Sequence, residues 1–207
     1  GNADQVPPGT PYVGQWSFSR EVQPGRVALT SYDFKRPSVD LQTNAAHPRE
    51  HSLGEYEQFD FQGEYTAKAD GQQLADNRAE EQAARHERLA GRTNAQTFAA
   101  GHVLELTRHW REDQNGKYLV THTQHTASVS GYESGNPAGE YSCSFAAIPA
   151  SQVFRPQRRT PKPFVQGPQT AQVVGPAGEE IFTDQYGRVK VQFHWDRYGK
   201  KDENSSC

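Results

Sequence analysis

A strict alternation of apolar and polar side chains at residues 188–196 constrains the fold of this chain more than any other feature. The apolar positions hold Val189, Val191, Phe193 and Trp195, and the polar positions hold Arg188, Lys190, Gln192 and His194. Successive side chains of a β-strand point to opposite faces, so this period of two predicts a strand with an apolar inner face and a charged outer face. The chain is therefore expected to build at least one β-sheet that buries this apolar face.

Other short apolar runs, bounded by turn-forming residues, predict that most of the chain is β-structure. We expect strands at residues 26–32, 53–61, 102–107, 118–130, 141–148, 171–174 and 179–183. The three middle segments are expected to form an antiparallel meander or part of a barrel. Only 33% of the residues are hydrophobic, while Gly (18) and Pro (13) are plentiful. This composition favours short strands and loops, completed by a partner or a trimer.

One segment, residues 72–90, has the period of an α-helix. Its apolar stripe consists of Leu74, Ala75, Ala79 and Ala83. Glu81 precedes Arg85 by four residues, a spacing that supports a helix, and Gly91 is well placed to end it. An alanine stripe buries little area, so the helix is expected to depend on docking against a sheet. The predicted fold class is therefore mainly β with one or more helices (α+β).

A basic, proline-rich segment at residues 155–163 is the best candidate for a domain boundary. It reads Arg-Pro-Gln-Arg-Arg-Thr-Pro-Lys-Pro, which predicts a stiff, extended connector. The formal charge changes sign close to this point, from −6 over the first 152 residues to +3 over the remainder. We therefore expect one domain at residues 1–154 and a second at residues 164–207.

The sequence contains no recognisable membrane-spanning segment or secretory signal peptide. No run is long and apolar enough to span a bilayer, and the first ten residues lack the basic-then-apolar pattern of a signal peptide. Methionine is absent, including from position 1, which predicts a piece of a longer protein. Cys143 is expected to be a buried small side chain and Cys207 an incidental terminus, with a disulfide or a reactive thiol as the alternative.

The spacings of the histidine, serine and carboxylate residues match no common catalytic or metal-binding motif. His86-Glu87 begins like a zinc-protease helix motif, but Ala90 holds the place of the second histidine. His122 and His125 lie three apart on a predicted strand, which sends one to each face, one solvated and one packed. We therefore predict no catalytic residues, no metal and no cofactor. A carboxylate pair assembled from distant positions stays open.

Nucleic-acid binding is not favoured as a function. The basic residues of the connector, together with Arg188 and Lys190, lie near aromatic side chains, as in small barrels that grip single strands. However, Phe193 and Trp195 belong to the apolar side of the predicted strand rather than to its basic side. The net charge of −3 also argues against a dedicated nucleic-acid binder.

Residues 179–207 resemble the signature of the VgrG family, in the form Tyr-Gly-Arg-Val-Lys-Val-x-Phe-x-Trp-Asp followed by Gly-Lys-x-Asp-Glu-Asn-Ser. The matching positions are Asp184, Tyr186, Gly187, Arg188, Val189, Lys190, Val191, Phe193, Trp195, Asp196, Asp202, Glu203 and Asn204. Looser similarity includes residues 27–37, the alanine-rich helix and the segment around Tyr118, so the resemblance spans nearly the whole chain.

The resemblance implies the spike of a type VI secretion system. Residues 1–154 would be the C-terminal part of a phage-tail-hub-like domain of β-barrel character, and residues 164–207 the truncated start of an OB-fold. The implied partners are two further copies in a homotrimer, the Hcp tube, the baseplate, a PAAR tip protein and effector cargo. The implied location is the bacterial cytoplasm during assembly, followed by secretion into the extracellular space or a target cell.

Two other functions are alternatives to the type VI spike. The first is the hub of a phage or another contractile injection tail. The second is an enzyme on the same scaffold, such as a peptidoglycan hydrolase or a metallopeptidase. The lack of a matching metal-ligand or nucleophile motif argues against an enzyme. An incomplete barrel would leave a strand edge unpaired, so residues 188–196 are expected to pair with another chain or with the hub.

Overall fold

The computed structural model describes residues 7, 9–47, 53–61, 63–128, 139–179 and 181–205. The chain divides into two compact units, Gly1–Arg158 and Arg159–Cys207. The division falls inside the basic, proline-rich segment at residues 155–163. Each unit has its own sheet structure and is described separately.

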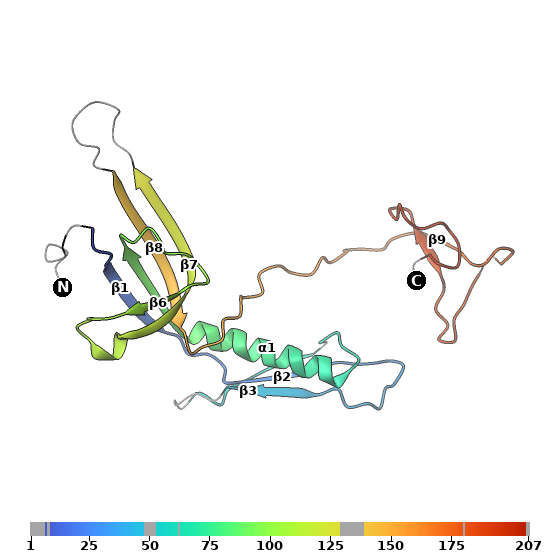
Figure 1. Ribbon diagram of the computed structural model, residues 1–207. Helices are drawn as coiled ribbons and strands as arrows, with labels where there is room; N and C mark the ends of the chain where they lie inside the picture. The colour runs from blue at the N-terminus through green and yellow to red at the C-terminus, as the bar shows by residue number, and fades with distance from the viewer. Residues whose placement is uncertain are drawn as a thin grey trace, which may run out of the picture. The chain divides into compact units, whose positions relative to one another are not determined.

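The first unit contains an antiparallel five-stranded sheet (Figure 1). Its strands, in spatial order, are β1 (Val13–Arg20), β5 (Glu87–Thr93), β8 (Glu140–Pro149), β7 (Gly116–Ser128) and β6 (Val103–Leu106). The last three confirm the expected antiparallel meander. A short 3₁₀ turn, Glu112–Gln114, precedes β7. The first two strands were not predicted from the sequence.

One face of this sheet carries an apolar cluster. Its buried members are Leu89, Leu104, Leu106, Tyr118, Val120, Phe145 and Ala147, and Val13, Trp16, Phe18 and Phe98 pack against them. The ring centroids of Trp16 and Tyr118 lie 5.0 Å apart in an edge-to-face arrangement, and those of Phe98 and Phe145 lie 4.9 Å apart. Large rings from distant segments therefore pack together with aliphatic side chains in this core.

A second, three-stranded sheet in the same unit packs against the single described α-helix. The sheet order is β3 (Thr43–Ala46), β2 (Arg26–Thr30) and β4 (Glu57–Phe61), with β4 parallel to β2. Helix α1 (Lys68–His86) runs alongside β2 and β3 (Figure 1). The buried cluster between them consists of Val27, Leu29, Leu41, Ala45, Tyr65, Ala75 and Ala79, with Leu74 packed against it. The small alanine side chains let the helix lie close to the sheet, as expected.

The helix begins and ends four residues earlier than the sequence predicted. It ends at His86 rather than near Ala90, and Gly91 lies inside β5 instead of capping the helix. The reason is tertiary, because Leu89 is buried in the core of the five-stranded sheet and its strand pairs with β1 and β8. The predicted support of Arg85 by Glu81 is also wrong: Arg85 lies 3.6 Å from Glu21.

The second unit contains a two-stranded antiparallel sheet. Strand β9 (Ala171–Val173) pairs with β10 (Val191–Phe193), and Thr183 and Val189 form an isolated bridge. The predicted strand at residues 188–196 is therefore only three residues long, and it pairs within its own unit. The segment predicted as a strand at residues 179–183 contributes, among its described residues, only the bridge at Thr183.

The predicted inner face of this strand is not the buried one. Trp195 is 68% exposed and Val189 is also exposed, whereas the polar Gln192 is only 4% exposed. Burial of Gln192 is possible because its side chain makes hydrogen bonds inside the unit, described below. The mainly β fold class with a helix is confirmed, but the alternation assigned the buried side of this strand incorrectly.

Candidate functional site

The residues that match the family signature form a series of turns around β10 in the second unit. The first turn centres on Asp184, whose carboxylate accepts the backbone N–H groups of Tyr186 (2.8 Å) and Arg188 (3.0 Å). It also accepts the Arg188 side chain at 2.6 Å. Gly187 has φ +74°, a left-handed conformation that glycine adopts without steric cost. The signature Asp-x-Tyr-Gly-Arg is therefore a turn held by one carboxylate.

Hydrogen bonding decides the protonation state of Asp184. Burial acts to raise the pKa of its carboxyl group, but the hydrogen bonds from Arg188 and Tyr186 together lower that pKa below its ordinary value. The guanidinium of Arg188 also lies 5.6 Å from the centroid of the Tyr186 ring. Asp184 is thus an ionised, fully engaged hydrogen-bond acceptor and is poorly suited to act as a proton donor in catalysis.

Gln192 forms the centre of the next part of the motif. Its Nε2 donates to the carbonyl of Asp196 at 2.9 Å, and its Oε1 accepts the hydroxyl of Ser205 at 3.0 Å. Gly199 packs so closely that a Cβ there would lie 2.0 Å from Oε1 of Gln192. One buried amide therefore ties β10 to the two turns that follow it.

Those two turns repeat the use of aspartate as a backbone acceptor. Oδ1 of Asp196 accepts the N–H groups of Tyr198 (2.9 Å) and Gly199 (3.1 Å), and these bonds lower the pKa of its carboxyl group. Oδ1 of Asp202 accepts the N–H of Asn204 at 2.9 Å. Aspartate favours such turns because its short side chain reaches the backbone two residues ahead. The acidic motif residues thus shape the chain, while Glu203 is exposed.

The aromatic motif residues lie on the surface of the second unit. Phe193 and Trp195 stack with centroids 5.1 Å apart and an interplanar angle of 14°. The indole N–H of Trp195 donates to Oε1 of Gln169 at 2.9 Å. Ile181 and Tyr198 are also exposed large side chains of this unit.

The described histidines do not converge on a metal site. His122 pairs with Ala146 and His125 with Cys143, so the two point to opposite faces of β7, as predicted. Both are exposed, so the expectation that one of the two is packed is wrong. Nδ1 of His125 lies 2.6 Å from the hydroxyl of Tyr141. Within the described residues, no group of three or more His, Cys, Asp or Glu side chains is arranged to hold a metal ion.

Cys143 is a buried free thiol of β8, as expected. Burial raises the pKa of its thiol, which keeps it protonated and weakly nucleophilic. Cys207 lies outside the described residues. The described part of the chain therefore presents Cys143 as a packing residue.

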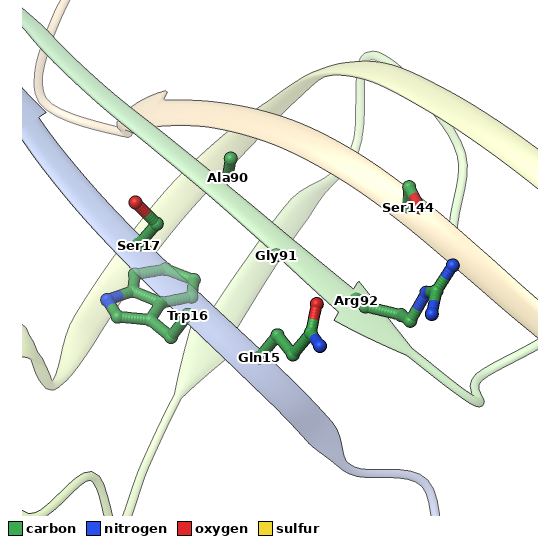
Figure 2. Close-up of a pocket in the computed structure, with 7 residues that line it drawn as sticks. All are labelled: Gln15, Trp16, Ser17, Ala90, Gly91, Arg92 and Ser144. Carbon is green, nitrogen blue, oxygen red and sulfur yellow. The ribbon is translucent and has the colours of Figure 1, made fainter.

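A depression of about 330 Å³ lies on the five-stranded sheet. Figure 2 shows the side chains that line it. Its lining residues are Gln15, Trp16, Ser17, Ala90, Gly91, Arg92 and Ser144, which come from β1, β5 and β8. The set contains neither a carboxylate nor a histidine, so it offers no general acid or base for catalysis. No pattern in the sequence indicated this depression, because it depends on how the strands pair.

No α-helix in the described ranges combines the length and the apolar character that a bilayer crossing requires.

Comparison with known proteins identifies the family. Residues 1–131 match the model of the phage tail baseplate hub (GPD). The chain is 46% identical over 194 residues to the type VI secretion system spike protein VgrG1a of Pseudomonas aeruginosa, a match that covers 93% of this chain and 30% of that protein. It is 35% identical over 210 residues to VgrG5 of the same bacterium, covering 95% of this chain and 26% of VgrG5.

A third relative has a different name. The chain is 33% identical over 202 residues to the actin cross-linking toxin VgrG1 of Vibrio cholerae, covering 96% of this chain and 18% of the toxin. This chain thus spans less than a third of each relative described here. The matches nevertheless run across both of its units. The chain therefore belongs to the VgrG family, with the phage tail baseplate hub represented by residues 1–131.

Proposed function

We propose that this chain is part of a spike at the tip of a type VI secretion system. In the full-length protein it forms a homotrimer that is mounted on the Hcp tube, contacts the baseplate, carries a PAAR tip protein and effector cargo, and punctures the target cell. The observation that carries this proposal is the 46% identity to a type VI spike protein across 93% of the chain. The match of residues 1–131 to a tail hub supports the same role.

The two units have separate parts in this proposal. Residues 1–154 belong to the C-terminal part of the hub domain, residues 155–163 are the connector, and residues 164–207 are the N-terminal part of the OB-fold. The boundary between compact units at Arg158 supports this division. The signature residues have a structural role, because the carboxylates of Asp184, Asp196 and Asp202 accept hydrogen bonds from backbone N–H groups.

Exposed apolar side chains in both units support assembly with other protein. Phe59 and Phe61 of β4 are exposed, and Gln58 and Asp60 of the same strand contact α1, so the two rings point away from the helix. Trp195 adds to the exposed apolar surface in the second unit. In a trimeric spike these surfaces are covered by neighbouring subunits or by the remainder of the full-length chain.

The proposal places the protein in two locations. It is assembled in the bacterial cytoplasm and is then expelled into the extracellular space or into a target cell by contraction. It has no catalytic activity within the present chain, and its sites take no cofactor. Two units joined by an extended connector suit a structural part of a delivery device.

A deletion and complementation experiment tests this function. In the bacterium that encodes the protein, removal of the full-length gene is expected to abolish release of Hcp into the medium, and the wild-type gene is expected to restore it. Purified full-length protein is expected to have the mass of a trimer by light scattering and to retain Hcp in a pull-down. Normal Hcp release without the gene would disprove the secretion role.

A tail hub of a phage or another contractile injection particle is the second candidate. The observation in its favour is the matched model itself, which describes a phage tail baseplate hub. Purified contractile particles separate the two candidates, because this alternative requires the protein in particles that lack Hcp. For the enzyme alternative, turnover of peptidoglycan in a zymogram of the purified chain would contradict the structural role.

A further inference from the structure

The connector between the two units begins as a segment fastened to helix α1. After β8 ends at Pro149, the side chain of Gln152 donates to the carbonyl oxygen of Ala83. Arg155 forms an ion pair with Glu80. Arg158 lies 3.4 Å from Oε2 of Glu81, and its backbone N–H donates to Oε1 of the same carboxylate at 3.2 Å. All of these residues belong to the first unit.

The contacts begin at the turn that follows β8, because the backbone N–H of Gln152 donates to the carbonyl of Pro149 at 3.0 Å. Residues 153–158 form neither helix nor strand. Pro156 disfavours helical geometry at the preceding residue and so keeps this part extended. The side chains of Gln152, Arg155 and Arg158 all reach α1, and their partners Glu80, Glu81 and Ala83 lie within one helical turn.

The acceptors on α1 are available to the connector because the neighbouring charges already have partners. Arg78 pairs with Asp60 at 2.9 Å, and Arg85 pairs with Glu21 at 3.6 Å. Glu81 is only 8% exposed. A carboxylate covered to this degree is costly to leave unpaired, so Arg158 compensates a charge that the helix itself does not neutralise.

The same contacts are open to solvent on the arginine side. The side chains of Arg155 and Arg158 are about half exposed, whereas those of Glu80 and Glu81 are largely covered, so water and salt screen the attraction in part. When the segment detaches, both glutamates regain contact with water. Detachment of residues 152–158 would add roughly 20 Å of extended chain to the connector. The fastened segment therefore determines how much of the connector is part of the first unit.

From this geometry we infer that residues 152–158 form a reversible strap on α1, closed by the pairs Arg155–Glu80 and Arg158–Glu81 and opened by salt. The strap sets the point at which the chain leaves the first unit. It is a conformational device that controls the reach of the second unit, and it holds whether or not the spike function proposed above is correct.

Trypsin cleavage reports directly on this strap. Arg155 and Lys162 precede proline and resist trypsin, so the connector offers cleavage after Arg158 and Arg159. In the closed strap, the backbone N–H of Arg158 is bonded to Glu81, so cleavage after Arg158 requires a local opening of the segment. The double variant Glu80→Gln/Glu81→Gln of the full 207-residue chain is expected to be cut at these bonds about fivefold faster than wild type, followed by mass spectrometry of the fragments.

The control variant is Glu87→Gln, which removes the ion pair with Arg20 but does not touch the connector. Its cleavage rate after Arg158 is expected to equal that of wild type. Equal rates for the double variant and wild type would overturn the inference. Equal acceleration by the control would do the same, because it would show general loosening of the unit.

A second measurement uses the wild-type chain and does not depend on the folding of a variant. Its cleavage rate, divided by that of a synthetic peptide of residues 152–166, is expected to rise several-fold between about 0.05 and 0.5 M NaCl. The peptide lacks α1 and corrects for the effect of salt on trypsin. A ratio that stays constant with salt would show that charge pairs do not hold the segment.

Discussion

Phe145 of β8 lies against Gly91 of β5 so closely that a Cβ on the glycine would be 2.5 Å from Cζ of the ring. Trp16 of β1 pairs with Gly91 from the other side, and the centroids of the two rings are 6.2 Å apart. The missing side chain therefore lets two aromatic rings, from the two strands that flank β5, meet across it. Aromatic cover of a strand glycine in this way helps to fix the register of a sheet.

Replacement of Gly91 by alanine is expected to destabilise the first unit by about 1–3 kcal/mol, because the new methyl group overpacks the core against Phe145. The matched control is Ala90→Val, at the next residue on the exposed face of β5, where a change of about 0.5 kcal/mol or less is expected. Urea unfolding of both variants measures the difference. Equal stability of Gly91→Ala and wild type would show that the rings are not held as described.

Tyr65 provides a test of the smaller sheet. It is buried, and its hydroxyl group donates to the carbonyl of Leu41 at 2.7 Å. The substitution Tyr65→Phe leaves that buried acceptor without its donor and is expected to cost about 1–2 kcal/mol in the free energy of unfolding. Tyr56→Phe, at an exposed tyrosine, is the control and is expected to leave the unfolding curve unchanged.

The lowered pKa of Asp113 leads us to expect that the folded protein loses stability in acid. Hydrogen bonds from Arg111, and then from Gln114, lower its pKa from 3.8 to about 2 in the folded chain. A lowered folded-state pKa stabilises the protein above the unfolded-state value, and this contribution disappears as the pH falls from about 4 to 2. The Tm of Asp113→Asn is therefore expected to be below that of wild type at pH 6 and to converge with it near pH 2. Parallel Tm curves at all pH values would contradict this assignment.

Substitution of Gln192 tests whether its side chain holds the two turns that follow β10. The substitution Gln192→Ala removes the hydrogen bonds to Asp196 and Ser205, so the backbone amides of residues 196–205 are expected to exchange hydrogen about tenfold faster. Gln172→Ala is the control, because Gln172 is the exposed cross-strand partner of Gln192 in β9. Hydrogen–deuterium exchange with mass spectrometry measures both. Faster exchange in the control alone would refute the central role of Gln192.

The contrast between α1 and β5 shows why element boundaries were harder to predict than elements. The alanine stripe correctly predicted a helix docked on a sheet, since Ala75 and Ala79 are buried against β2 and β3. Local propensity alone allowed the helix to continue to Ala90. The burial of Leu89 ends it earlier, because a strand that pairs on both edges contributes more than one further helical turn.

For the strand at residues 188–196, the sequence pattern predicted the wrong buried face. Its alternation predicted a buried Trp195, which is exposed, and an outward Gln192, which is buried. Period-two patterns identify which residues share a face, and the stacking of Phe193 on Trp195 agrees with that. They do not identify the face that is covered, because this depends on what lies across from it.

The sequence by itself determined the fold class, the docked helix, the antiparallel strands β6, β7 and β8 and the family resemblance, because each is encoded in local periodicity or in a contiguous motif. Only the tertiary structure decided the place of β1 and β5, the burial of Gln192 and the fastening of Arg158 to Glu81. These features join residues far apart in the chain, and their free energy comes from contacts that exist only after the segments have packed.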